Sequence, residues 1–173
     1  QIIGFGGRVI DPTDNPKYLN SSDSDIFKKG RELYGLSEIL KNKKRINRIV
    51  VVEGYTDVLS LFSNDMNYAV ATLGIATSKV HIDKLFTHVD EVIFCFDGDD
   101  AGVKAAESAL NISLSGLRDG KKIKFMFLPE GEDPSSLLEK EGKEEFETRM
   151  ENSKVLSEYL FENILKKYDD SIE

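Results

Sequence analysis

The sequence predicts an α/β fold with an open, mostly parallel sheet flanked by helices. Four short apolar runs, rich in β-branched and aromatic residues, alternate with stretches whose apolar residues recur at helical spacing. The resulting order β-α-β-α-β-α-β is typical of a parallel sheet whose right-handed crossovers place helices on both faces. Three of the four runs end in acidic residues, at the edge of the sheet where ligands bind in this fold class.

The first 47 residues are expected to have a different structure from the rest. Residues 1–24 contain several glycines and the turn signals Asp11-Pro12 and Asn15-Pro16, which indicate irregular structure or a hairpin. Residues 25–44 carry an apolar stripe at helical spacing, and we expect a helix there, although Gly30 and Gly35 weaken the pattern.

The alternating elements begin at residue 49. We expect strands at 49–52, 68–71, 91–96 and 122–128, with helices around 58–62 and at 79–86, 101–117, 134–141, 143–151 and 153–168. Ser78 or Thr77 can cap the second helix of this series. These elements divide the chain into a partial basic N-terminal subdomain (1–47), a central module (48–142) and the start of a C-terminal helical subdomain (143–173).

The net charge of −8 conceals two unlike halves. Residues 1–50 hold ten Lys and Arg against six Asp and Glu, a net charge of +4, whereas residues 51–173 hold 13 against 25, a net charge of −12. Such asymmetry suggests separate roles for the halves. On composition alone, a solvated basic helix face before an ordinary acidic domain is the commoner explanation, and a basic surface for nucleic acid is the other. The single cysteine, Cys95, rules out an internal disulfide and a multi-cysteine zinc site, and we expect it to be a buried, inert thiol. The absence of any apolar run of about 20 residues predicts no membrane helix.

Acidic residues follow three of the predicted strands. They are Glu53 and Asp57 after the first, Asp97 and Asp99 after the third, and Asp133 after the fourth. Oxygen ligands without histidine or cysteine favour Mg²⁺ or Mn²⁺ over zinc. Taken singly, these aspartates have ordinary explanations, because Asp57 suits the first turn of a helix, Asp99 or Asp100 can cap the helix that follows, and Asp133 before Pro134 suits an N-cap. Three acidic strand ends on one edge favour a metal site.

Two histidines fall outside this scheme. His81 and His88 lie in or beside one predicted helix without a nucleophile motif, so we expect surface or packing roles for both.

Several ordered motifs resemble a known module. Val52-Glu53-Gly54-Tyr55-x-Asp57, Ala71-Thr72-Leu73-Gly74, Phe96-Asp97-Gly98-Asp99-x-Ala101-Gly102 and Leu128-Pro129-x-Gly131-Glu132-Asp133-Pro134 are similar to TOPRIM, which primases, topoisomerases and some nucleases share. Upstream, Gly4-Phe5-Gly6-Gly7-Arg8, Pro16-Lys17-Tyr18-Leu19-Asn20-Ser21 and Phe27-Lys28-Lys29-Gly30-Arg31-x-Leu33-Tyr34-Gly35-Leu36 resemble the bacterial DnaG-type DNA primases. The resemblance runs over most of residues 3–160.

The resemblance implies specific roles by position. The catalytic residues would be Glu53, Asp97 and Asp99. The ligands of Mg²⁺ or Mn²⁺, with two or more ions possible, would be Glu53, Asp57, Asp97, Asp99 and Asp133. The residues in contact with template or nucleotide would be Arg8, Lys17, Lys29, Asn20, Thr72 and Gly74. The reaction would be the synthesis of short RNA primers from ribonucleoside triphosphates on single-stranded DNA. The family further implies a bacterial cytoplasmic protein at the replication fork, with no membrane partner.

The chain departs from the family at two positions and covers only part of it. Asp100 stands where relatives usually have a basic residue, and Ser135 where many have a further acid, which leaves the number of metal ions open. The zinc domain, the upstream part of the polymerase domain and the C-terminal domain that binds the replicative helicase are not represented. Because the chain also opens on Gln1, we expect an excerpt that primes weakly or not at all.

Three alternatives remain at this stage. Another TOPRIM enzyme, a nuclease or a topoisomerase, would share the acids but not the basic motifs upstream. A receiver-like or phosphatase-like Mg²⁺-binding α/β domain would also place aspartates at strand ends. A non-catalytic interaction module would bind no metal.

Overall fold

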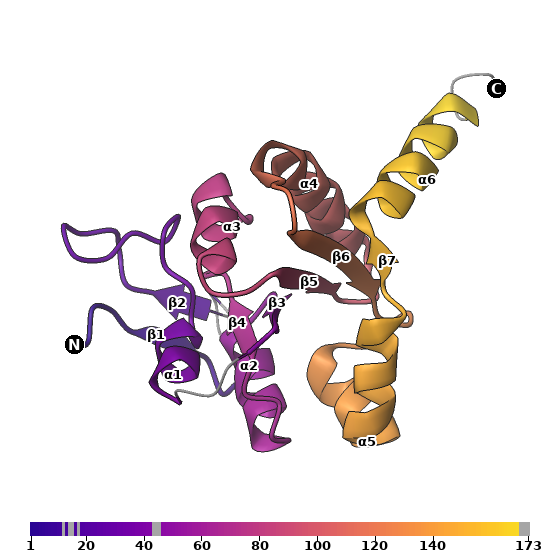
Figure 1. Ribbon diagram of the computed structural model, residues 1–173. Helices are drawn as coiled ribbons and strands as arrows, with labels where there is room; N and C mark the ends of the chain where they lie inside the picture. Colours follow the sequence, from indigo (N-terminus) through magenta and orange to yellow (C-terminus); the bar gives the residue numbers. More distant parts are fainter. Residues whose placement is uncertain (12, 14–15, 17, 43–45, 170–173) are drawn as a thin grey trace.

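The computed structural model describes residues 1–11, 13, 16, 18–42 and 46–169, and within them a five-stranded sheet runs through the molecule in the order β4-β3-β5-β6-β7 (Figure 1). Its strands are β3 (Arg48–Val52), β4 (Ala69–Ala71), β5 (Glu91–Phe96), β6 (Lys122–Phe127) and β7 (Lys154–Val155). The first four are parallel, and β7 pairs antiparallel to β6. The predicted α/β class and mostly parallel sheet are therefore confirmed.

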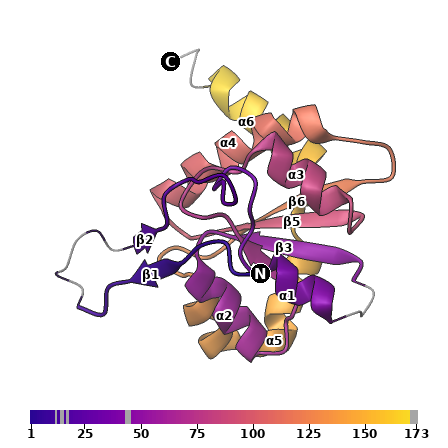
Figure 2. The same cartoon turned by 90° about the vertical axis from the view of Figure 1, so that its left-hand side faces the viewer.

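Helices cover both faces of the sheet (Figure 2). The helices are α1 (Leu36–Lys41), α2 (Tyr55–Ser63), α3 (Lys79–Phe86), α4 (Asp100–Gly116), α5 (Pro134–Glu151) and α6 (Leu156–Asp169). Helices α3, α4 and α6 pack on one face, and α2 and α5 on the other. In the described residues, no helix is both long and apolar enough to span a bilayer.

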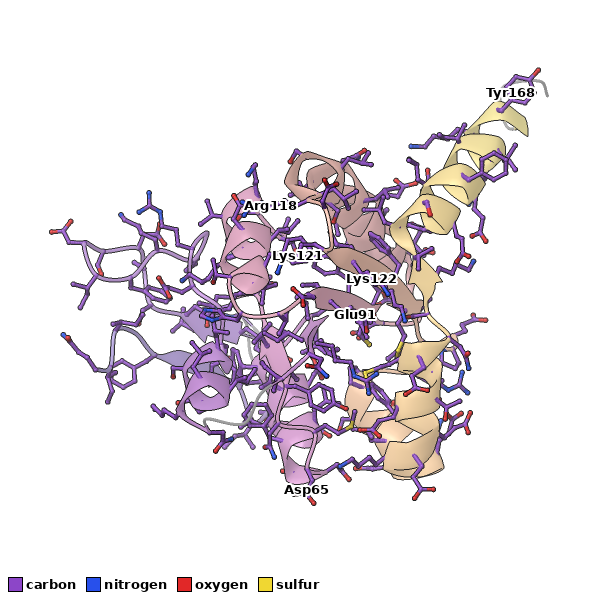
Figure 3. All side chains as sticks on the ribbon, viewed as in Figure 1. Asp65, Glu91, Arg118, Lys121, Lys122 and Tyr168 are labelled. Atoms are coloured by element: carbon purple, nitrogen blue, oxygen red, sulfur yellow. The ribbon has the colours of Figure 1, made fainter. Side chains whose placement is uncertain are left out.

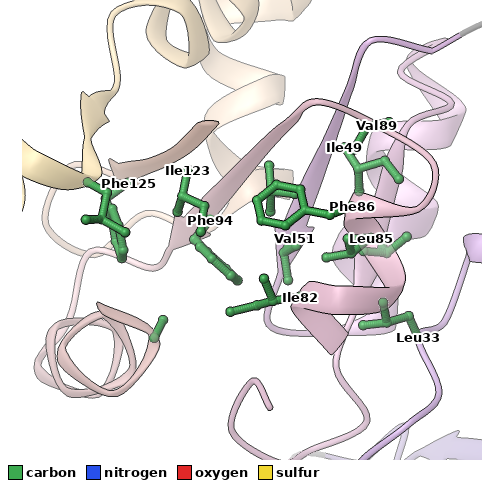
Figure 4. Packing of buried hydrophobic residues seen from close by; sticks show 14 of the residues in the cluster. Leu33, Ile49, Val51, Ile82, Leu85, Phe86, Val89, Phe94, Ile123 and Phe125 are labelled. Carbon is green, nitrogen blue, oxygen red and sulfur yellow. The ribbon is translucent and has the colours of Figure 1, made fainter. Parts of the chain in front are cut away.

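The alternation of side chains along the strands builds a core on each face. On β5, Phe94 belongs to the cluster under α3 and α4, while Ile93 and Cys95 belong to the cluster under α2 and α5. Figure 4 shows Phe94 beside Phe125 of β6 and above Ile82 of α3. Each fully buried side chain of this size stabilises the fold by about 1.5–3 kcal/mol. Cys95 is buried as expected, and burial raises the pKa of its thiol well above the usual value.

Helix boundaries follow the expected caps. Ser78 accepts a hydrogen bond from the backbone N–H of His81 and starts α3, and Asp99 and Asp133 start α4 and α5 in the same way. Gly142 has non-helical dihedral angles inside α5, which separates the two helices expected at 134–141 and 143–151.

The helix expected over 25–44 is wrong except for α1. Gly35 has φ of +86° and precedes α1, and a Cβ at this position would lie 2.8 Å from the carbonyl oxygen of Ala69. Tyr34 and Ala71 exchange backbone hydrogen bonds of 2.9 and 3.1 Å, which hold the preceding segment against β4. The apolar stripe reflects real burial of Phe27 and Leu33, but in a non-helical segment. Residues 43–45 lie outside the described residues.

The helix expected over 153–168 is also wrong at its start. Lys154 and Val155 form β7, and α6 begins only at Leu156. Pairing with β6 outweighs the weak local preference of these two residues for a helix.

A separate two-stranded hairpin supports the expectation for residues 1–24. Strands β1 (Gly6–Arg8) and β2 (Tyr18–Asn20) pair antiparallel and extend away from the sheet beside α2 (Figure 2). Its residues Arg8, Tyr18 and Asn20 reach the same pocket as residues that follow β3 and β5.

Candidate active site

A pocket of about 450 Å³ opens at the carboxyl end of the parallel strands. The sheet contributes Glu53 after β3 and Asp97 after β5, and the hairpin contributes Arg8 from the other side. The remaining lining residues are Tyr18, Asn20, Gly54, Tyr55, Thr56, Asp57, Thr72, Gly74, Asp133 and Ser135. Acidic groups from the sheet and a cation from the hairpin therefore share one cavity.

Glu53 and Asp97 each carry a buried oxygen without a partner. Within the described part of the chain, Glu53 Oε1 and Asp97 Oδ1 are inaccessible to solvent and accept no hydrogen bond. Burial, with repulsion from Glu53 and other neighbouring carboxylates, raises the pKa of Asp97 from 3.8 to about 7. Burial also raises the pKa of Glu53, the backbone N–H of Asp97 acts in the opposite direction, and the charges of Asp99 and Asp57 add to the rise. Such unsatisfied acceptors are costly unless a proton or a cation occupies the site.

The other three acids use one oxygen each as a helix cap. Asp57 Oδ2 accepts from the backbone N–H of Gly54 at 2.9 Å, Asp99 Oδ1 from Gly102 at 2.7 Å, and Asp133 Oδ1 from Ser136 at 2.8 Å. The ordinary explanation of these aspartates is thus confirmed. A carboxylate has a second oxygen, so the cap does not prevent a second role.

Burial and charge also act on Asp57. Burial raises the pKa of the Asp57 carboxyl and repulsion from Asp133 adds to it, while the Gly54 N–H and Arg8 act in the opposite direction. Arg8 of the hairpin thus favours the charged form of Asp57.

The loops after β5 and β6 are pinned together by their backbones. Gly98 donates from its N–H to the carbonyl of Glu132 at 3.0 Å and accepts from the N–H of Gly131 at 2.9 Å. A Cβ at Gly98 would collide with the backbone carbonyl of Pro129. Glycine is therefore required for the approach that brings Asp97 beside the Asp133 loop.

Tyrosines attach the hairpin to the sheet. The Tyr55 hydroxyl donates to the carbonyl of Gly7 at 2.6 Å, and its ring lies edge-on to Tyr18 with centroids 5.5 Å apart. The Arg8 guanidinium lies 5.4 Å from the centroid of Tyr18. Asn20 donates from Nδ2 to the carbonyl of Leu73 at 3.1 Å, while its Oδ1 is buried with no partner among the described residues.

The structure brings most of the predicted site residues together. Those that line the pocket are Arg8, Asn20, Glu53, Asp57, Thr72, Gly74, Asp97 and Asp133. Asp99 and Lys29 do not line it, and Lys17 lies outside the described residues. The roles assigned to all of these residues stay predictions. In the described ranges, no three Asp, Glu, His or Cys side chains converge as a ready-made set of metal ligands.

The sequence reasoning gave no site role to Tyr18, Tyr55, Thr56 or Ser135, all of which line the pocket. Tyr18 and Tyr55 are 37 positions apart in the chain, and only the docking of the hairpin brings them together. Thr56 lies in the motif Val52-Glu53-Gly54-Tyr55-x-Asp57, at the position written x. Its closeness in sequence to Glu53 was the one signal that could have placed it at the site.

A second hollow of about 510 Å³ lies at the amino ends of the strands. Its lining includes Glu91 and Lys122, which Figure 3 labels where β5 and β6 begin. The charges here are largely paired, with Lys121 at 2.7 Å from Asp90 and Lys124 at 3.7 Å from Glu91. This hollow lacks the buried unpaired carboxylates that mark the first pocket.

Comparisons with known proteins identify the fold and its relatives. Residues 50–138 match the Toprim-like family, and residues 1–40 match the N-terminal domain of the DNA primase catalytic core. The match of residues 1–40 does not favour a nuclease, a topoisomerase or a receiver-like domain. The DNA primase of Escherichia coli K12 is 52% identical over 169 residues, which are 98% of this chain and 29% of that protein.

Solved structures agree with the sequence matches. The structure of the DnaG catalytic core superposes with a TM-score of 0.92 at 51% identity, covering 96% of this chain and 54% of the other. A DnaG primase catalytic domain solved with bound single-stranded DNA gives a TM-score of 0.91 at 51% identity over the same shares of both chains. This chain thus spans less than a third of its curated relative and about half of the solved cores. The chain belongs to the Toprim-like family and, within it, to the DnaG-type DNA primases, matching part of their catalytic core.

Proposed function

We propose that this chain supplies the metal-dependent nucleotidyl-transfer site of a DNA primase, which joins ribonucleoside triphosphates into short RNA primers on single-stranded DNA. The observation that carries this proposal is the pair of buried, unpartnered oxygens of Glu53 and Asp97, which belong to a pocket that Arg8 enters from the hairpin. The membership in the DnaG-type primases supports it.

The acidic residues of the pocket fit a divalent cation. The orphaned oxygens of Glu53 and Asp97 would be the first to hold Mg²⁺ or Mn²⁺, and the second carboxylate oxygens of Asp57 and Asp133 would complete the set. When bound, such ions neutralise the charge of the triphosphate and of the pyrophosphate that leaves. Asp99 is proposed as a more distant member, because its side chain caps α4 outside the lining of the pocket.

The chain's own residues supply binding, orientation and proton transfer. Arg8 would contact phosphate oxygens as a fixed cation. The other carboxylate oxygen of Glu53, Oε2, would accept the proton from the 3′-hydroxyl as the 3′-oxygen bonds to the α-phosphorus and the bond to pyrophosphate breaks. Asn20 Oδ1, which has no partner in the described chain, would accept a hydrogen bond from bound nucleotide.

The basic half of the chain is proposed to hold the template. A relative was solved with bound single-stranded DNA, and Lys17, Lys29, Thr72 and Gly74 are proposed to lie along the path of a strand or nucleotide here. Lysine and arginine contact the backbone without reading its sequence. Work at a bacterial replication fork in the cytoplasm, and contact with the replicative helicase through a further domain, belong to the same proposal.

Primer synthesis tests the proposal directly. It is measured on single-stranded DNA with a protein of the relatives' full length that carries this chain, as wild type and as Glu53→Gln, Asp97→Asn or Glu130→Gln. Glu130 is an exposed acid of the Asp133 loop outside the pocket and serves as the matched control. Loss of priming in Glu53→Gln and Asp97→Asn, with normal priming in Glu130→Gln, supports the proposal. Normal priming in both Glu53→Gln and Asp97→Asn contradicts it. The 173-residue chain alone is expected to prime weakly or not at all.

A further inference from the structure

The turn formed by residues 28–32, here called the basic turn, carries three cations without ion-pair partners. Lys28 and Arg31 are exposed and Lys29 is half-buried, and among the described residues no carboxylate forms an ion pair with their side chains. The Asp23 carboxylate contacts the turn through its backbone, accepting from the N–H of Lys29 at 3.1 Å. The turn is closed internally, since the Lys28 carbonyl accepts from the N–H groups of Arg31 and Glu32 at 2.9 and 3.0 Å. Unpaired cations on a rigid turn suit contact with phosphates.

Helix α3 holds this turn from outside. Ser78 Oγ donates to the carbonyl of Gly30 at 2.8 Å, and His81 Nε2 lies 3.1 Å from the carbonyl of Lys29. One turn further along α3, Lys84 forms an ion pair of 3.1 Å with Glu32. Residues of α3 and its N-cap thus bind Lys29, Gly30 and Glu32 of the turn, and Arg31 remains exposed.

The hydrogen bonds of His81 determine its tautomer. The backbone N–H of Ser78 points to Nδ1 at 3.2 Å, so Nδ1 must accept. The Lys29 carbonyl can only accept, so Nε2 must carry the proton. His81 is fully buried, and burial lowers the pKa of its imidazole, which keeps the ring neutral. Of the surface or packing role expected for His81, the structure therefore shows a buried ring that also hydrogen-bonds the Lys29 carbonyl.

The basic turn borders the candidate active site. Gly74 lines the pocket and lies beside Asn20, with an added Cβ 3.5 Å from its Nδ2. The next residue, Ile75, lies against Gly30, where an added Cβ would be 3.9 Å from the Ile75 Cδ1. The turn therefore lies, at Gly30, against the residue that follows Gly74 of the pocket, on the side of the loop between β4 and α3.

We propose that Ser78 and His81 are positioning residues. By holding the carbonyls of Gly30 and Lys29, they direct the side chains of the basic turn, Lys28, Lys29 and Arg31, toward the backbone of a single-stranded nucleic acid that enters the pocket. The inference rests on the proposed function, because it needs a strand to bind there. It assigns no contact with the strand to Ser78 or His81 themselves.

Ser78→Gly separates this role from helix capping. Glycine removes the hydroxyl that donates to Gly30, yet as an N-cap it costs only a few tenths of a kcal/mol. Ser78→Thr keeps both donor and acceptor and is the matched control. His81→Asn is the second test, because its side-chain oxygen can accept from the Ser78 N–H but its amide is too short to reach the Lys29 carbonyl. Melting curves establish that each variant is folded.

The measurement is the affinity of the 173-residue chain for fluorescein-labelled oligothymidylate, by anisotropy over a series of salt concentrations. We expect Ser78→Gly and His81→Asn to weaken binding about three- to tenfold. The slope of log K against log salt concentration should become less steep by about 0.7 for each Lys or Arg side chain that no longer contacts the strand. Ser78→Thr should match wild type. A purely structural role would lower the melting temperature and leave the slope unchanged.

A double-mutant cycle completes the test. In a chain that carries Lys28→Ala, Lys29→Ala and Arg31→Ala together, adding Ser78→Gly should have no further effect on binding. Equal losses in both backgrounds, or no loss in the wild-type background, would overturn the inference and leave the proposed function standing. If the wild-type chain itself fails to bind the oligonucleotide at low salt, both the template-binding part of the proposed function and this inference are wrong.

Discussion

Glu53 and Asp97 follow the neighbouring parallel strands β3 and β5, and each has a side-chain oxygen that is buried without a hydrogen-bond partner in the described chain. Two such oxygens in one pocket lower stability unless protons or cations are bound. This edge of the sheet therefore lowers the stability of the fold when nothing is bound there, and it is where the proposed chemistry would take place.

The first prediction concerns pH. The pKa of Asp97 is raised from 3.8 to about 7 in the fold, so the native state binds more protons than the unfolded chain between these values. The stability that the neutral carboxyl contributes is full below pH 3.8 and is lost as pH rises through about 7. With metal removed by a chelator, Asp97→Asn should raise the melting temperature most at about pH 8, less at about pH 5, and hardly at all below pH 3.8.

The control for this prediction is Asp119→Asn, which changes an exposed aspartate in the turn before β6. It should shift the melting temperature equally at each of these pH values. An effect of Asp97→Asn that does not depend on pH would contradict the account of Asp97.

The second prediction concerns Gly98. An alanine at this position would drive its Cβ into the carbonyl of Pro129, so the loops after β5 and β6 would have to separate. Gly98→Ala should reduce the free energy of unfolding by about 1–3 kcal/mol, measured by urea denaturation. Gly7→Ala, where the nearest atom to a Cβ is 3.9 Å away, should change it by less than about 0.5 kcal/mol. Equal effects would show that the close approach of the loops is not the constraint.

The third prediction separates two roles of Asp99. Its Oδ1 caps α4, which asparagine can also do, whereas alanine cannot. Asp99→Ala should cost about 1 kcal/mol of stability and Asp99→Asn much less. Mn²⁺ affinity decides whether Asp99 is also a ligand, since Asp99→Asn removes the charge and keeps the cap. An unchanged affinity would leave Asp99 as a cap alone.

The fourth prediction concerns the attachment of the hairpin. Tyr55→Phe removes the hydroxyl that donates to the carbonyl of Gly7. The loss of this hydrogen bond should reduce the stability of the docked β1–β2 hairpin by about 0.5–1.5 kcal/mol. Amide hydrogen exchange should speed up in β1 and β2 and stay unchanged in β5. Tyr34→Phe alters another ring of the same cluster and should leave exchange in the hairpin as it is. Uniformly faster exchange with Tyr55→Phe would indicate global destabilisation instead.

The sequence was informative wherever local pattern and packing agree. The apolar runs that became β3 and β5 are recognisable because both of their faces are buried, and β6 is recognisable by its alternating apolar residues. Acidic residues before α4 and α5 indicate the helices that Asp99 and Asp133 cap. The acidic strand ends could be located because parallel strands align their carboxyl ends at one edge.

The errors arose where distant contacts decide the structure. The segment before α1 has helical spacing but is held against β4 by Tyr34 and Ala71, which are 37 positions apart. Tyr18 and Tyr55 reach the pocket only through the docking of the hairpin, and His81 finds the Lys29 carbonyl 52 positions away. Local patterns carry no signal for such pairings.

The central claim is that the buried oxygens of Glu53 and Asp97 hold a divalent cation. Titration calorimetry of the 173-residue chain with Mn²⁺ tests it most directly, with Glu53→Gln, Asp97→Asn and the exposed control Glu130→Gln. We expect binding by the wild type and the control, and loss of binding in the other two, each checked for folding. Mn²⁺ binding that persists unchanged in both Glu53→Gln and Asp97→Asn, or that is absent from the wild type, would contradict the account.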